Sequence, residues 1–188
     1  MWKMLENLRK KMWKRKLSNK VEINNLINLK VTKNKIFKKE NSLFFIIIFV
    51  IFFADRYSKN IILENFSDNT FYINNFINFN LVWNTGIGFG LLSFESSLYY
   101  NLISLMIFLL ILFLVIVSFS SDKIDKIIFS IIIGGALGNF YDRVSFKAVP
   151  DFIDLHYGNF HWFTFNLADI FITIGIITFI MKDFFIKN

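Results

Sequence analysis

LYYNLISLMIFLLILFLVIVSF, residues 98–119, contains a single amide, Asn101, and no charged residue. A helix needs about 20 predominantly apolar residues to cross the roughly 30 Å hydrocarbon core of a bilayer. This stretch meets both requirements of length and composition. It therefore predicts a membrane-spanning helix that faces lipid over most of its surface.

Three further stretches have a similar length and apolar character but also carry polar residues: 42–63, 124–144 and 165–185. Over all 188 residues, 55% are hydrophobic and 26 are Phe. A water-soluble globule of this composition would expose too much apolar surface. We therefore expect an all-α membrane protein with four transmembrane helices.

The chain contains no cysteine. Disulfide frameworks, thiolate nucleophiles and Cys-ligated zinc or iron–sulfur sites are therefore excluded.

Basic residues gather at the N-terminus, where residues 1–40 hold 13 of the 21 Lys and Arg and three of the 14 acids. Because this segment directly precedes an apolar run, anionic lipid headgroups suit it better than nucleic acid. We expect residues 1–41 to form a disordered cytoplasmic extension and residues 42–188 to form the membrane domain. No small-residue cleavage site follows the first apolar run, so a cleaved signal peptide is not expected.

The connection between the first two apolar stretches contains a strand pattern. Phe79, Leu81 and Trp83 alternate with asparagines, which is the period of a half-buried strand. The sequence thus predicts a small β-element at the membrane surface, added to the four helices.

The distribution of Lys and Arg predicts the orientation. The basic extension, Lys123 and Lys126, and the C-terminal Lys182 and Lys187 fall on one side of the four predicted spans, and the connection 64–97 has neither Lys nor Arg. By the positive-inside rule both termini are cytoplasmic and the long connections face outward.

In this topology, polar residues from three of the four predicted helices and from the outer connections lie at the same depth. They are Asp55, Arg56, Lys59, Asn84, Asn139, Asp142, Arg143, Asp151, Asn166 and Asp169. Ionisable groups near a bilayer cost several kcal/mol unless they are paired or face an aqueous cavity. Their shared level predicts one common site at the outer face.

Five blocks of the chain resemble the ordered sequence blocks of the lipoprotein signal peptidases, also called signal peptidase II. The blocks are DRYSK (55–59), NTGIGFG (84–90), GGALGNFYDR (134–143), PDFID (150–154) and FNLAD (165–169). The resemblance implies a four-helix aspartic protease of the bacterial inner membrane. It implies a lipid-modified prolipoprotein as substrate, cut just before its diacylglyceryl-modified Cys.

By motif position, the resemblance makes Asp151 and Asp169 the catalytic pair. Two carboxylates that share a proton can hold a water between them, one as general base and the other polarising the peptide carbonyl. No metal or other cofactor is then required. The resemblance gives a substrate-binding or site-supporting role to Asp55, Lys59, Asn84, Gly86, Asn139, Asp142, Arg143 and Asn166.

Several alternatives remain open at the level of sequence. A non-catalytic membrane binding protein or a small transporter could use the same polar cluster, and a metal-dependent hydrolase is a third reading. Asp55 and Lys59, at i and i+4, could simply neutralise each other or could contact substrate or headgroups. His156 and His161 match no metal-ligand spacing and are read as interface residues. We expect membrane lipids as partners and no nucleic acid, and the sequence does not indicate an oligomeric state.

Overall fold

The computed structural model describes residues 39–66, 70–86 and 97–186, so the predicted disordered extension lies largely outside the described residues. The described helices are α2 (Lys39–Asn65), α3 (Ser97–Ser120), α4 (Lys123–Phe146) and α5 (Leu167–Ile186). The described strands are β1 (Phe71–Tyr72), β2 (Ile77–Asn84), β3 (Val149–Tyr157) and β4 (Phe160–Phe165).

The helices agree with the four apolar stretches predicted from the sequence. Within the described ranges, two segments are long and apolar enough to cross a membrane: Tyr100–Ser120 of α3 and Lys123–Phe146 of α4. The predicted start of the last helix at residue 165 is two residues early, because Phe165 still belongs to β4 and α5 begins at Leu167.

Helix α4 is the central packing element, and glycines on two of its faces allow close approach of its neighbours. A Cβ on Gly134 would lie 2.9 Å from the Cβ of Ile51 in α2. A Cβ on Gly135 would lie 2.7 Å from the carbonyl oxygen of Ala168 in α5. Both distances are too short for real side chains, so small residues at these positions bring the backbones together.

An apolar core fills the space between α2, α3 and α4 away from the sheet. Its buried members are Phe44, Ile111, Ile128, Phe129, Ile132 and Ile133. The outward surfaces of the helices remain apolar as well, and α3 exposes Leu102, Met106, Phe113 and Ile116 among others. A helix that is apolar all round is typical of burial in lipid.

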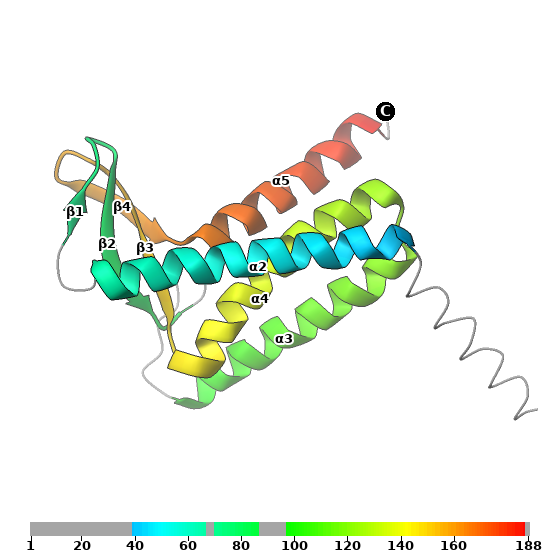
Figure 1. Ribbon diagram of the computed structural model, residues 1–188, viewed down its shortest axis with the longest axis horizontal. Helices are drawn as coiled ribbons and strands as arrows, with labels where there is room; N and C mark the ends of the chain where they lie inside the picture. The colour runs from blue at the N-terminus through cyan, green and yellow to red at the C-terminus, as the bar shows by residue number, and fades with distance from the viewer. Residues whose placement is uncertain (1–38, 67–69, 87–96, 187–188) are drawn as a thin grey trace, which may run out of the picture. The chain divides into compact units, whose positions relative to one another are not determined.

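The strands form one antiparallel sheet in the order β1-β2-β3-β4, which lies at the end of the helices where α4 ends and α5 begins (Figure 1). The strand predicted around Phe79 to Trp83 is confirmed as part of β2. Residues 145–164, between the last two helices, contain β3 and most of β4, strands that the sequence did not predict. Gly158, with φ 59°, forms the tight turn between these two strands.

Pro150 fits into β3 because of where β4 ends. It pairs with Trp83 of β2, whereas β4 pairs with β3 only from Ile153 onward. One side of β3 at Pro150 is thus a sheet edge, where the missing N–H of proline is tolerated.

Candidate active site

Asp151 is a buried carboxyl in the central strand β3, with only 2% of the residue exposed. Its Oδ2 accepts a hydrogen bond from the Asn84 side-chain amide at 2.8 Å, and its Oδ1 accepts one from Asn166 at 2.6 Å. Burial, and then the nearby charge of Asp169, raise the pKa of Asp151 to about 7. A carboxyl with this pKa exchanges protons near neutral pH, as a general acid or base must.

Asp169 lies in the first turn of α5 and forms a reciprocal cap with Asn166. The backbone N–H of Asp169 donates to Asn166 Oδ1 at 3.1 Å, and the backbone N–H of Asn166 donates to Asp169 Oδ2 at 3.2 Å. This is the capping-box arrangement, with Asn and Asp in the two roles. The cap fixes the Asp169 carboxyl at the N-terminus of the helix.

Asn166 therefore holds both aspartates. Its side-chain oxygen caps α5 through Asp169, while its side-chain amide donates to Asp151. Asn139 of α4 supports the other Asp169 oxygen by donating to Oδ1 at 2.8 Å. The two carboxyls thus accept hydrogen bonds from the side-chain amides of Asn84, Asn139 and Asn166 and from the backbone N–H of Asn166.

Lys59 is a fully buried cation next to the two carboxyls, and it binds residues of both α2 and α4. Its ammonium donates to Asp55 Oδ2 at 2.8 Å, Asp142 Oδ2 at 2.7 Å and Asn139 Oδ1 at 2.9 Å. These bonds join α2 to α4, and all three N–H donors of the ammonium are used. The i and i+4 pairing predicted for Asp55 and Lys59 is present, but it is part of a larger network.

Asp55 also reaches α5. Its Oδ1 accepts from the backbone N–H of Ala168 at 3.1 Å, so a carboxylate of α2 caps the helix that carries Asp169. The sequence analysis did not find this contact, because the partner is a backbone group 113 residues away.

Arg56, which the sequence places at the level of the common site without a specific role, contacts the same carboxylates as Lys59. Its Nη1 lies 2.6 Å from Asp142 Oδ1, and its guanidinium lies 4.9 Å from the centroid of the Tyr141 ring. Its place next to Asp55 in the DRYSK block was the available signal. Asp142 thus pairs with α2, so its neighbour in sequence, Arg143, is left for other partners.

Arg143 connects α4 to the loop that follows β2. Its Nη1 donates to the carbonyl of Asn139 at 3.1 Å, and its Nη2 donates to the carbonyl of Gly86 at 3.0 Å. The N–H of Gly86 in turn donates to Asn84 Oδ1 at 2.8 Å. Hydrogen bonds therefore run in series from Arg143 through Gly86 and Asn84 to Asp151.

Asp154 and the two histidines form a separate group further along β3. His161 Nδ1 lies 2.7 Å from Asp154 Oδ2, and the rings of His156 and His161 stack with centroids 5.4 Å apart. No set of three or more His, Cys, Asp or Glu in the described ranges is arranged to hold a metal ion.

The site therefore consists of two buried carboxyls that are oriented by asparagines, next to a buried network in which Lys59 neutralises Asp55 and Asp142. The model of the family described as signal peptidase (SPase) II matches residues 47–185. The chain belongs to the signal peptidase II family. Membership makes it a protease of the aspartic type and decides against the binding-protein and transporter alternatives.

Relatives of the signal peptidase II family agree with this assignment. The lipoprotein signal peptidase of Pelagibacter ubique is 47% identical over 158 residues, which cover 82% of this chain and 95% of that protein. The lipoprotein signal peptidase of Francisella tularensis subsp. novicida is 39% identical over 77% of this chain and 93% of its own length. A solved bacterial membrane enzyme superposes with a TM-score of 0.61 at 28% identity, covering 78% of this chain and 92% of that one.

Proposed function

We propose that this signal peptidase II family member removes the signal peptide of diacylglyceryl-modified prolipoproteins, just before the lipidated Cys, with Asp151 and Asp169 as its catalytic pair. The observation that carries the proposal is the double role of Asn166, which donates to Asp151 and caps Asp169. One residue thereby fixes the relative placement of two buried carboxyls.

The two aspartates take different roles. Asp151, with a pKa raised to about 7, carries the shared proton, and Asp169, at a helix N-terminus that favours negative charge, acts as general base. Asp169 takes a proton from water as the water oxygen attacks the scissile carbonyl carbon, and Asp151 gives its proton to the carbonyl oxygen. The C–N bond of the resulting diol then breaks as Asp169 passes the proton that it took from water to the nitrogen of the Cys, while a diol hydroxyl returns a proton to Asp151 and the C=O bond re-forms. The products are a signal peptide carboxylate and a free amine on the lipidated Cys.

The other polar residues support this pair. Asn84 and Asn139 orient the carboxyls, and Arg143 holds the Gly86 loop against α4. Lys59, Asp55 and Asp142 join the helices beneath the pair.

In the membrane, α2, α3, α4 and α5 all span the bacterial inner membrane, with both termini in the cytoplasm and the sheet at the outer surface. The apolar outward faces of the described helices and the membrane-enzyme neighbour support this placement. The diacylglyceryl chains of the substrate then lie among the helices, while the scissile bond meets the aspartates at the bilayer surface. Burial of each CH₂ contributes roughly 0.8 kcal/mol before ordering costs.

The test uses purified full-length protein with a diacylglyceryl-modified prolipoprotein and its unmodified form. We expect cleavage immediately before the Cys, far faster for the lipidated form. Asp151→Asn and Asp169→Asn should each remove nearly all cleavage, and the double variant should lose little more than the worse single one, because the two groups act as a unit.

Asp154→Asn is the matched control, since Asp154 is an equally buried carboxyl on the same strand. It should keep substantial activity. Loss of activity in Asp154→Asn with retention in Asp151→Asn would show that the pair is misassigned, and equal efficiency on both substrate forms would contradict lipid selectivity.

A further inference from the structure

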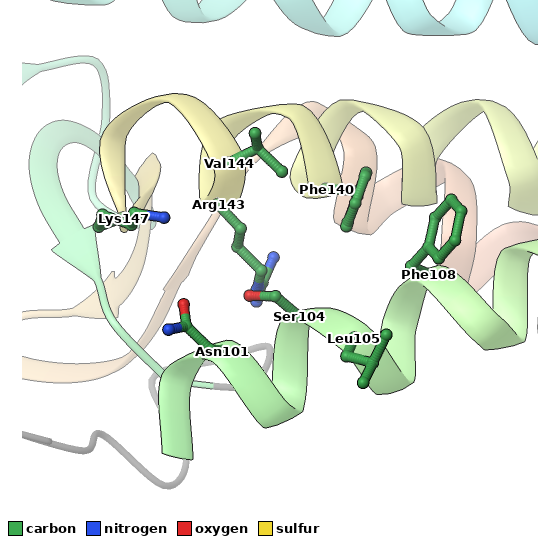
Figure 2. Close-up of a pocket in the computed structure, with 8 residues that line it drawn as sticks. All are labelled: Asn101, Ser104, Leu105, Phe108, Phe140, Arg143, Val144 and Lys147. Atoms are coloured by element: carbon green, nitrogen blue, oxygen red, sulfur yellow. The ribbon is translucent and has the colours of Figure 1, made fainter. Parts of the chain in front are cut away.

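A cavity of about 190 Å³ lies between α3 and α4, on the side of Arg143 that faces α3 (Figure 2). Its lining residues are Asn101, Ser104, Leu105, Phe108, Phe140, Arg143, Val144 and Lys147. None of the asparagines and aspartates that hold the catalytic pair lines it. The cavity is therefore distinct from the carboxyl pair, although Arg143, which lines it, also bonds to the carbonyls of Asn139 and Gly86 beside the pair.

One end of the cavity is basic. Arg143 is only 4% exposed, and its Nε is buried without a hydrogen-bond partner, while both of its Nη atoms donate to carbonyls. Figure 2 shows its side chain extending from α4 toward Ser104 on α3. Lys147 and the amide of Asn101 line the same end, and none of the described residues that line the cavity is acidic.

The other end is apolar and continues along the two helices. Leu105, Phe108, Phe140 and Val144 form its walls, and the rings of Phe108 and Phe140 stack with centroids 5.5 Å apart. Both helices contain a segment apolar enough to cross a membrane. A ligand that fits must thus have a small anionic group next to a hydrocarbon chain.

We propose that the α3–α4 cavity binds the phosphodiester group of an anionic membrane phospholipid, with an acyl chain along Leu105 and Phe108. Two cations, with no acid among the described lining residues, favour a phosphate over the neutral diacylglyceryl group of the substrate. The unsatisfied Arg143 Nε supplies a charge-assisted donor that is buried and therefore costly to leave unpaired.

The bound lipid also acts on the catalytic pair through Arg143. The carboxyls of Asp151 and Asp169 also attract the guanidinium electrostatically. A phosphate in the cavity balances this attraction and holds Arg143 where its Nη2 supports the carbonyl of Gly86, whose N–H donates to Asn84. The phospholipid thus has a structural role, because it fixes the side chain of Arg143.

Native mass spectrometry of the full chain in neutral detergent tests the proposal, with three probes: dioleoylphosphatidylglycerol, dioleoylglycerol and inorganic phosphate. We expect one tightly held phosphatidylglycerol, at least tenfold tighter than dioleoylglycerol, and weaker binding of phosphate alone. Lys147→Asn should weaken phosphatidylglycerol binding about fivefold, as expected for one cation near an anionic headgroup. Asn is chosen because Lys147 has φ 58°, a conformation that Asn tolerates.

Ser104→Leu is a second variant, which fills the cavity without changing its charge and should abolish the tight site. Lys123→Asn is the control, because it removes the same charge from the opposite end of α4. If dioleoylglycerol binds as tightly as phosphatidylglycerol, the cavity recognises only acyl chains. If inorganic phosphate binds as tightly as phosphatidylglycerol, the cavity recognises a free anion and not a lipid. Either result overturns the proposal, as does unchanged binding in both cavity variants.

The measurement reads binding alone, so its failure leaves the peptidase assay unaffected and the two proposals can fail separately. Thermal unfolding midpoints of Lys147→Asn and Ser104→Leu, compared with the wild type, separate lost binding from lost folding.

Discussion

Lys59 places a full positive charge where no water reaches it, and its two carboxylate partners, Asp55 and Asp142, are equally buried. A buried network of charges adds little to the free energy of unfolding compared with apolar residues in the same places. Removing one charged member, however, leaves an uncompensated buried charge. The lysine is therefore indispensable once both acids are present.

We predict that Lys59→Met lowers the free energy of unfolding by about 3–5 kcal/mol, because Asp55 and Asp142 lose the buried ammonium that both bind and keep only Arg56 as a shared cation. Thermal unfolding in detergent measures this loss. Lys182→Met is the matched control, since Lys182 also joins two acids, Asp122 and Asp125, but at a solvent-exposed position. A larger effect for Lys182→Met would contradict the importance of the buried network.

The raised pKa of Asp151 predicts a pH dependence of stability. The folded protein holds this proton up to about pH 7, whereas the unfolded chain releases it near pH 3.8. The native state thus binds more protons between these values, so this group stabilises the fold at low pH and its contribution is lost as pH rises to about 7, by at most about 1.4 kcal/mol per pH unit.

The free energy of unfolding of the wild type and of Asp151→Asn should be compared between pH 5 and 8. Relative to the variant, the wild-type value should fall with pH by this slope, and the difference should level off above about pH 7. Cleavage by the wild type should fall over the same upper range, because deprotonated Asp151 has no proton for the carbonyl. Identical pH profiles for the two proteins would show that Asp151 titrates at its ordinary pKa.

At this scale the sequence predicted which residue types gather but not how they pair. Asp55 with Lys59 follows from helical spacing. The link from Asp55 to the N–H of Ala168 does not, because it depends on the approach of α2 to α5. Asp142 and Arg143 are adjacent in sequence, but their side chains bind different neighbours, Lys59 of α2 and the carbonyl of Gly86, which the sequence does not reveal.

Among the elements, α4 sets the positions of the others through its small residues. A Cβ on Gly138 would collide with the Asp55 carboxylate that binds Lys59 and caps α5. Helix packing and the ionic network therefore depend on the same position.

We predict that Gly138→Ala destabilises the protein by about 1–3 kcal/mol despite the higher helix propensity of Ala, because the carboxylate must move. Cleavage should fall with it, since Asp55 holds the start of α5. Ile124→Ala is the control, because it also introduces Ala into α4 but at an exposed position. Wild-type stability in Gly138→Ala would mean that α2 and α4 are not in close contact here.

The helices were predictable because long apolar stretches have few other solutions, whereas β3 and β4 were not found. The first six residues of β3 are mostly buried on both faces, so the polar and apolar alternation seen in β2 is missing. The signal that was available is the Gly158–Asn159 pair between two aromatic residues, with glycine at the first central position as a type II′ hairpin turn requires.

For the whole molecule, the proposed topology can be tested directly because the chain has no cysteine of its own. Single cysteines introduced at Ser18 and Asn188 should react with a membrane-impermeant thiol reagent only from the cytoplasmic side. Cysteines at Asn69 and Asn159 should react only from the outside. The reverse pattern at any of the four would refute the assignment of both termini to the cytoplasm.

The capping of α5 has a consequence for shortened forms of the chain. Asn166 caps α5, and Asp169 lies in the first turn of this helix, where Asn139 of α4 donates to its carboxyl. A chain that stops before residue 166 lacks one member of the proposed catalytic pair and the residue that positions the other, so we expect it to be inactive.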